Sequence, residues 1–233
     1  MESREEVAVI FDLGGVVLNS PFPAIAEYEA LHGLPENAVH AIIGKSGEQG
    51  AFARLERGEL SVEEFPSEFA ADCELLGLPK RVDGGEIIQL ILQSCTPRPL
   101  WVEALGLLRS SQVKTAALTN NFRSSAGDDR FSTSMAEIRN LFDVCVESAS
   151  EGLRKPEPAI YELACSRLDV PPAACIFLDD IGRNLKPAKA MGMRTIRVEP
   201  SDATGRHALK ALAAMLGGAA GRRLQQSLRL ARL

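Results

Sequence analysis

The sequence is poor in the residues that build thiolate metal sites, disulfide scaffolds and aromatic surfaces. It has five cysteines, three histidines and 5% aromatic residues among 233 positions. The cysteines form no C-x-x-C pair and lie beside no histidine cluster, so we expect neither a zinc site nor a disulfide framework. An odd number of thiols favours buried, reduced cysteines, and a cytoplasmic location is the expectation.

Long apolar runs and an excess of positive charge are also missing. No apolar stretch approaches the ~20 residues of a membrane-spanning helix, and we expect no membrane span. The charged residues 1–6 lack the apolar region of a secretory signal. A net charge of −5 argues against nucleic acid as a partner. The remaining composition is that of a globular protein with one large domain, or one domain with an insertion.

Two kinds of hydrophobic pattern divide the chain. Residues 7–11 are typical of a buried strand, and from residue 98 onward helical and strand patterns alternate. We predict further strands at 113–118, 142–146, 175–178 and 195–198, and helices at 100–110, 134–141, 158–167 and 185–191. This alternation predicts an α/β fold in which helices flank a parallel sheet.

The segment between the first strand and this alternating region has helical periodicity throughout. Glycine or proline separates its apolar stretches, as at the ends of helices. We predict helices at 24–31, 38–43, 51–55, 62–76 and 86–92. The chain is therefore expected to consist of a core made of residues 1–18 and 98–200, and an inserted all-helical cap of residues 19–97.

The C-terminal segment 201–233 differs from the rest in charge. From residue 203 onward it has six basic residues and no acidic one. We predict a helix, a break at residues 217–221, and a short basic amphipathic helix. A solvated or frayed terminus is the simpler interpretation, and contact with an interface or an anion is the alternative.

Polar residues follow three of the predicted strands. Asp12 follows the first strand, Thr119 and Asn120 follow the second, and Asp179 and Asp180 follow the fourth. The carboxyl ends of parallel strands meet at one edge of a sheet, where α/β proteins bind their ligands. We therefore expect these residues to lie close together.

The acidic pair Asp179 and Asp180 would repel unless a cation lay near it. With Asp12 as a third carboxylate, the oxygen ligands suit Mg²⁺; the alternative is two solvated loop acids. Lys155, in the sequence Lys-Pro-Glu-Pro, presents an ammonium that could neutralise a phosphate or hold an aspartate. With Thr119 as a short hydroxyl donor and Asn120 as an amide donor, this set predicts a phosphoryl-transfer site.

Four motifs in this order resemble motifs I to IV of the haloacid dehalogenase (HAD) superfamily. They are FDLGGVV at 11–17, LTNN at 118–121, KPEPAIY at 155–161 and IFLDDIGRNLKPA at 176–188. The resemblance covers about residues 7–198, and it is to the N-terminal phosphatase-like lobe of soluble epoxide hydrolase and the N-terminal domain of some acyl-CoA dehydrogenases. It implies a Rossmann-like HAD core with a helical cap, but not the activities of the other lobes of those proteins.

The resemblance also implies roles for the motif residues. Asp12 would be the nucleophile that forms an aspartyl-phosphate, which water then hydrolyses. Asp12, the backbone carbonyl of Gly14 and Asp180 would bind Mg²⁺, with Asp179 in direct or water-mediated support.

The remaining roles concern the substrate, which would be a small-molecule phosphate ester. Thr119, Asn120 and Lys155 would hold its phosphoryl group, and Asn184 would be a secondary residue of the site. The identity of the ester and the oligomeric state stay open at this point.

Gly14 departs from the pattern of most phosphatases in the superfamily. They carry at this position a second Asp that protonates the leaving alcohol, and such acid–base help is worth ~10²–10⁴-fold in rate. Gly14 predicts a weak phosphatase, an enzyme with a substitute acid, or a non-catalytic phosphate- and Mg²⁺-binding or regulatory domain. A 2-haloacid dehalogenase is a further alternative, because halide leaves without a proton, although dehalogenases do not need the acidic pair.

Overall fold

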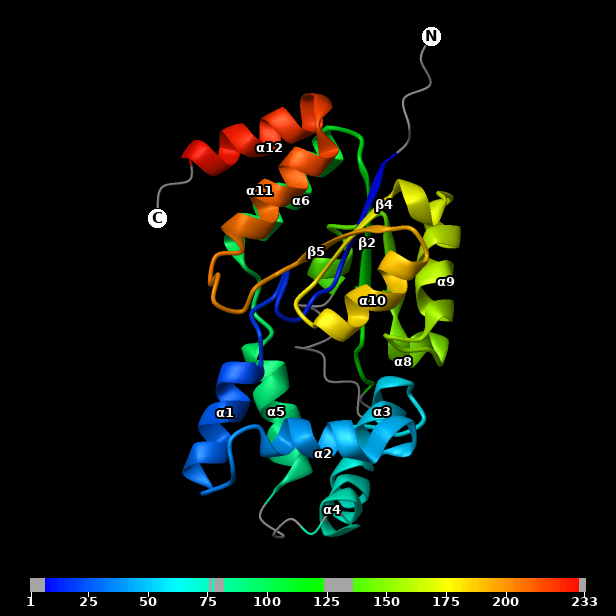
Figure 1. Cartoon of the computed structure of the whole chain (residues 1–233). Coiled ribbons are helices and arrows are strands. Elements are labelled where there is room, and N and C mark those ends of the chain that lie inside the picture. The colour runs from blue at the N-terminus through cyan, green and yellow to red at the C-terminus, as the bar shows by residue number, and fades with distance from the viewer. Residues whose placement is uncertain (1–6, 76, 78–81, 124–135, 231–233) are drawn as a thin grey trace.

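Five parallel strands form one sheet in the computed structural model, which describes residues 7–75, 77, 82–123 and 136–230 (Figure 1). Their spatial order is β3-β2-β1-β4-β5. Their bounds are β1 Ala8–Phe11, β2 Lys114–Thr119, β3 Val144–Glu147, β4 Cys175–Asp179 and β5 Arg194–Arg197. The predicted parallel sheet is confirmed, and β1, the first strand in the chain, lies at its centre.

Helices cover both faces of the sheet, as the fully buried central strand requires. The core helices are α6 Pro99–Ser110, α8 Ser148–Glu151, α9 Pro158–Leu168, α10 Gly182–Ala190, α11 Arg206–Leu216 and α12 Gly218–Leu230. Val9 and Phe11 of β1 pack in the hydrophobic cluster that includes α6, α11 and α12. Ala8 and Ile10 point to the opposite face, where α9 and α10 lie. This alternation of side chains fixes the register of the strand.

Several predicted core elements have different bounds in the structure. The third strand begins at Val144, because the Asp143 carboxylate accepts hydrogen bonds from the backbone N–H and the hydroxyl of Thr115 and so ends the preceding turn. Helix α10 begins at Gly182, three residues before the prediction, which places Asn184 inside a helix. The helix predicted at 134–141 is helical at 136–139, and its first two residues lie outside the described part.

The C-terminal segment was predicted wrongly in two respects. A single residue, Gly217, separates α11 from α12, and Gly221 lies within α12, where a Cβ atom would come 2.3 Å from the carbonyl oxygen of Ala213. Residues 206–230 are not frayed, because the apolar faces of both helices join the core beside α6. The buried leucines of these faces are Leu209, Leu212, Leu224 and Leu228.

A helical insertion lies between β1 and β2, as predicted, and has a hydrophobic core of its own. Its helices are α1 Phe22–Leu31, α2 Ala38–Ser46, α3 Ala51–Glu56, α4 Phe65–Leu75 and α5 Gly84–Ser94, with the 3-10 turn η1 Gly47–Gln49 after α2. The two chain segments that enter and leave it are paired, through a bridge between Leu18 and Pro97 and a hydrogen bond from Asn19 N to Thr96 O.

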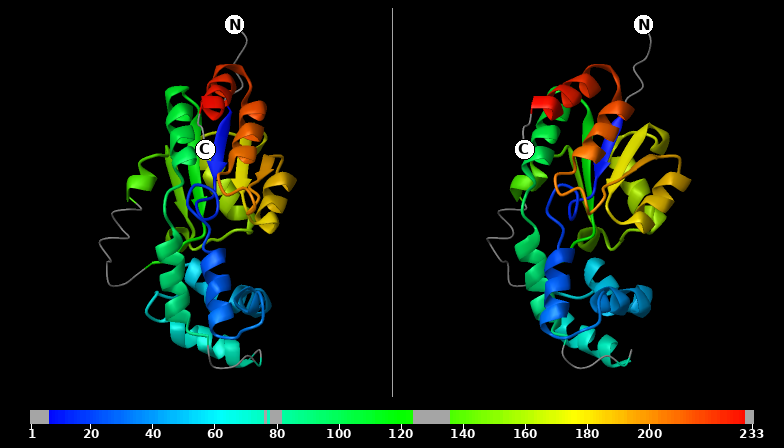
Figure 2. Two further views of the ribbon diagram at one scale, coloured as in Figure 1. Left: turned by 90° about the vertical axis from the view of Figure 1, so that its left-hand side faces the viewer. Right: turned by 60° about the vertical axis from the view of Figure 1, so that its left-hand side comes forward.

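This helical cap lies beyond the carboxyl ends of the strands, at the end of the molecule opposite α12 (Figure 2). Every strand therefore points its last residue toward the cap. Among the described residues, no helix combines the length and the apolar character that crossing a membrane requires.

Candidate functional site

The strand ends bring three carboxylates together, as the sequence predicted. Asp12 directly follows β1, and its N–H donates to the carbonyl oxygen of Leu178 in the neighbouring strand β4. Asp179 is the last residue of β4, and Asp180 follows it. One oxygen of each carboxylate lies within 4.8 Å of the others, and all three residues are buried.

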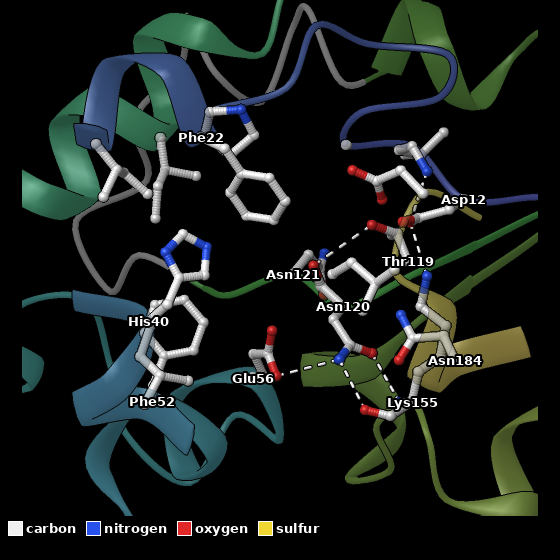
Figure 3. Close-up of a pocket in the computed structure, with 18 of the residues that line it drawn as sticks. Asp12, Phe22, His40, Phe52, Glu56, Thr119, Asn120, Asn121, Lys155 and Asn184 are labelled. Carbon is white, nitrogen blue, oxygen red and sulfur yellow. Dashed lines mark hydrogen bonds and ion pairs between the residues drawn. The ribbon is translucent and has the colours of Figure 1, made fainter. Parts of the chain in front are cut away.

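Lys155 binds two of these carboxylates from the loop before α9. Its Nζ lies 2.8 Å from Oδ1 of Asp12 (Figure 3). It also lies 2.8 Å from Oδ2 of Asp179. The side chain is 1% exposed, so its charge is compensated almost entirely by these two acids. They raise the pKa of Lys155 above its ordinary value, although burial acts in the opposite direction. Lys155 therefore stays an ammonium.

The cluster has more acid than Lys155 can neutralise. Burial, together with the negative charge of the neighbouring Asp179, raises the pKa of Asp180 to about 6. Burial also raises the pKa of Asp12 well above its ordinary value, while Lys155 opposes the shift. Within the described residues, Oδ1 of Asp180 is buried and has no hydrogen-bond partner. Oxygen ligands around an unpaired buried carboxylate fit a hard divalent cation such as Mg²⁺.

The turn after β1 is shaped by two glycines with different constraints. Gly15 has a φ of +75°, and a Cβ atom there would lie 2.1 Å from Oδ2 of Asp180. A side chain at residue 15 would therefore collide with the acidic cluster. At Gly14 no described heavy atom lies within 4 Å of the position of a Cβ atom, so a side chain would fit. The backbone of this turn is held by Arg98, whose Nη1 donates to the carbonyl oxygens of Gly15 and Val16.

Asn120 uses its side chain in a way that the sequence did not suggest. Its Oδ1 accepts a hydrogen bond from the backbone N–H of Lys155, and its Nδ2 donates to the carbonyl oxygen of Lys155 and to Oε2 of Glu56. Both amide hydrogens are thereby used within the protein. The contact of Asn120 with a phosphoryl group remains a prediction, and the structure places its side chain around Lys155.

Thr119 and Asn184 also line the cavity at the strand ends, with different surroundings. The Thr119 hydroxyl makes a long contact of 3.4 Å to the carbonyl oxygen of Asn120. The Nδ2 of Asn184 donates to both oxygens of Asp179 at 3.1 Å, and Tyr161 donates to the Asn184 carbonyl oxygen. The predicted role of Asn184 toward the substrate remains a prediction; its observed contact orients Asp179.

A cavity of about 530 Å³ lies between this cluster and the cap. Asp12, Thr119, Lys155 and Asp180 line it on the core side. The cap side is apolar apart from His40 and Glu56, and Figure 3 shows His40 beside Phe22 and Phe52, across the cavity from Asp12. The apolar side chains on that side are Phe22, Ile25, Ile43, Phe52, Ile87, Ile91 and Leu92.

Sequence reasoning missed the cap side of the site. Glu56 and His40 belong to helices whose apolar periodicity explains their neighbours, and nothing in the pattern marks either residue as facing a cavity. For Arg154 there was one weak indication in the sequence: it directly precedes Lys155, the first residue of the third motif. It is 3% exposed and binds Glu56 with Nε at 2.7 Å.

Comparison with known proteins agrees with this geometry. Residues 7–192 match the family described as haloacid dehalogenase-like hydrolase. The chain is 35% identical over 215 residues to acyl-CoA dehydrogenase family member 10 of Mus musculus, over 92% of this chain and 19% of that protein. It is 32% identical over 203 residues to bifunctional epoxide hydrolase 2 of Sus scrofa, over 84% of this chain and 37% of that protein. The chain therefore spans well under half the length of either relative.

A solved structure has the same fold. It is a HAD family enzyme from Bacteroides thetaiotaomicron in complex with magnesium and inorganic phosphate. The match covers 84% of this chain and 96% of that one, with a TM-score of 0.57 and 20% sequence identity. At this identity the similarity establishes the parallel sheet with its helical insertion as a shared architecture.

Proposed function

This chain belongs to the haloacid dehalogenase-like hydrolase family, and we propose that it is a Mg²⁺-dependent phosphatase acting on phosphate monoesters of apolar alcohols. The observation that carries the proposal is the buried cluster in which Lys155 binds Asp12 and Asp179 while Asp180 keeps an unpaired oxygen, at the base of a cavity with apolar walls. The phosphate-bound HAD enzyme supports it as a structural relative.

In this proposal Asp12 is the nucleophile. Its carboxylate attacks the phosphorus atom and forms a P–O bond while the bond to the ester oxygen breaks. The ester oxygen leaves as an alkoxide that takes a proton from water, and a second water then hydrolyses the aspartyl-phosphate. The Lys155 ammonium and the N–H of Leu13, at 2.8 and 2.7 Å, both bind Oδ1 of Asp12 and fix its rotamer. Lys155 also offsets the negative charge of the phosphoryl group, with Thr119 as a hydroxyl donor and Asn120 beside it.

Asp12, Asp180 and the carbonyl oxygen of Gly14 would hold Mg²⁺, with Asp179 in support. When bound, the ion neutralises phosphoryl charge, the main requirement of phosphoryl transfer. Gly14 has no proton to give to the departing alcohol, so we infer slow turnover of esters whose alcohol is a poor leaving group.

The apolar cap wall selects the alcohol. Each methylene group buried there contributes ~0.8 kcal/mol, which is about a fourfold gain in kcat/KM. A series of primary alkyl phosphates tests this directly: kcat/KM should rise with chain length until the cavity is filled, in the presence of Mg²⁺. Ile91→Thr, which puts a hydroxyl on a half-buried part of the wall, should flatten the rise. A flat chain-length profile in the wild type would refute the substrate class.

Dehalogenase chemistry is a further alternative, because dehalogenation does not need the acid that Gly14 lacks. The acidic cluster argues against it, since halide displacement from a 2-haloacid requires no metal. Halide release in the presence of a chelator would favour this alternative. Binding of Mg²⁺ and inorganic phosphate with no turnover on any ester would favour a non-catalytic binding domain.

A further inference from the structure

The cap contributes a carboxylate that bonds to the core. Glu56 is the last residue of α3, yet both of its hydrogen-bonding partners lie outside the cap. Its Oε2 accepts from Nε of Arg154 at 2.7 Å and lies 2.6 Å from Nη2 of the same guanidinium. The same oxygen accepts from Nδ2 of Asn120 at 3.1 Å (Figure 3).

Both partners of Glu56 also determine where Lys155 lies. Asn120 forms two hydrogen bonds with the backbone of Lys155. Its Oδ1 accepts from the Lys155 N–H at 2.8 Å, and its Nδ2 donates to the Lys155 carbonyl oxygen at 3.1 Å. Arg154 is the residue before Lys155 in the chain. The side chain of Lys155 then reaches Asp12 at 2.8 Å. A continuous set of short polar contacts thus runs from the cap to the nucleophile.

The surroundings of this link are buried and closely packed. Arg154 is 3% exposed, and burial raises the pKa of Glu56 while Arg154 opposes the shift. Just beyond α3, Gly58 has a φ of +70°, and a Cβ atom there would lie 2.3 Å from the carbonyl oxygen of Ala149 in α8. This end of the cap therefore packs directly on the core, next to the loop that presents Lys155.

We propose that Glu56 is a positioning residue for the reaction: through Asn120 and Arg154 it fixes Lys155 in the place where the ammonium holds Asp12. The inference rests on the proposed phosphatase function. In this proposal the cap helps to hold Asp12 in place, and it also contacts the alcohol of the substrate.

The test compares Glu56→Ala with Glu48→Gln on p-nitrophenyl phosphate. Glu48 also binds Arg154, at 3.0 Å, but its side chain is 60% exposed, and within the described residues it makes no hydrogen bond to Asn120. Misplacement of a catalytic group by about 1 Å can cost ~10²-fold, so we expect kcat of Glu56→Ala to fall about 10- to 100-fold and KM to rise less, by about fivefold. Glu48→Gln should stay within about twofold of the wild type. A wild-type kcat in Glu56→Ala, or an equal loss in Glu48→Gln, would overturn the proposal.

Two further variants separate positioning from a loss of folding. Glu56→Gln keeps an acceptor oxygen for Asn120, so it should fold and retain kcat within about fivefold of the wild type. Residues that act through one another are non-additive, so adding Glu56→Ala to Asn120→Ala should lower kcat by less than about threefold more. Thermal unfolding checks that both single variants are folded. If they are, and the loss of kcat in the double variant equals the product of the two single losses, Glu56 does not act through Asn120.

A direct binding measurement keeps this inference distinct from the proposed function. If the wild type releases no phosphate from any ester, the proposed function fails. Titration calorimetry with inorganic phosphate in the presence of Mg²⁺ still reports on the Lys155 ammonium. Glu56→Ala should then bind phosphate at least about fivefold more weakly than the wild type, and equal affinities would overturn the positioning role.

Discussion

Replacing Gly14 with aspartate should accelerate the hydrolysis of alkyl phosphates. The position has room, because no described heavy atom lies within 4 Å of a Cβ atom built there. The new carboxyl group would stand two residues after Asp12, where a proton can reach the departing alcohol. Acid–base help is worth ~10²–10⁴-fold in evolved sites.

In this chain we expect a gain at or below the lower limit of that range. The new carboxylate joins Asp12 and Asp180, whose pKa values are already raised by burial and by the negative charge of Asp179. A gain of about 10- to 100-fold in kcat corresponds to about 1.4–2.7 kcal/mol of barrier. The gain should be below about threefold for p-nitrophenyl phosphate, because a nitrophenolate leaves readily without a proton.

The assay is phosphate release from one alkyl and one aryl phosphate at saturating Mg²⁺. Gly14→Asn is the matched control, since it has the shape of aspartate and no acidic proton. Gly15→Ala is a contrasting variant, because its Cβ atom would meet Asp180 at 2.1 Å and should destabilise the protein. The reasoning is refuted if a folded Gly14→Asp gains nothing on the alkyl ester, or if Gly14→Asn gains as much.

Two further outcomes follow from the charge of the cluster. Lys155→Met leaves Asp12 and Asp179 buried without their cation, so unfolding in urea without metal should show a loss of about 3–5 kcal/mol; an unchanged midpoint would contradict this. Because the folded-state pKa of Asp180 is raised to about 6, from 3.8, the metal-free protein should lose on the order of 2–3 kcal/mol as pH rises between those values. Calorimetry should then show a larger Mg²⁺-induced rise in Tm near pH 7.5 than near pH 5; equal rises would count against a Mg²⁺ site at Asp180.

The core of the fold and the acidic cluster could be predicted from local patterns. Buried strands alternating with helices imply a parallel sheet, and a parallel sheet brings its carboxyl ends to one edge. Asp12, Thr119 and Asp179 each stand at such an end, so their convergence follows from topology alone. The family resemblance, carried by four motifs, is confirmed by the match over residues 7–192.

The cap side of the site could not be predicted, because it depends on contacts between distant segments. Glu56 and Arg154 are 98 residues apart, and no local pattern shows that they pair. Asn120 was predicted to bind a phosphoryl group because it follows the second strand with an amide donor, and that contact stays a prediction. The bonds of its amide hydrogens to Glu56 and Lys155 could not be predicted. These assignments needed the packing of α3 against the core.

The burial of the C-terminal segment could have been predicted from the spacing of its leucines. Its basic charge suggested a solvated tail, but its leucines recur at intervals of three and four residues, which is the spacing of an apolar helix face. Leu209 and Leu212 of α11, and Leu224 and Leu228 of α12, are buried in the core. Apolar periodicity was the better predictor of packing here, and net charge described the solvent-facing side.

The central claim is that Asp12 is the nucleophile of a Mg²⁺-dependent phosphatase. Phosphate release from p-nitrophenyl phosphate, measured for the wild type and for Asp12→Asn with Mg²⁺ and with a chelator, tests it most directly. We expect the wild type to release phosphate only when Mg²⁺ is present. We expect no release above background by Asp12→Asn, or by either protein with the chelator. Turnover that persists in Asp12→Asn, or without the metal, would contradict it.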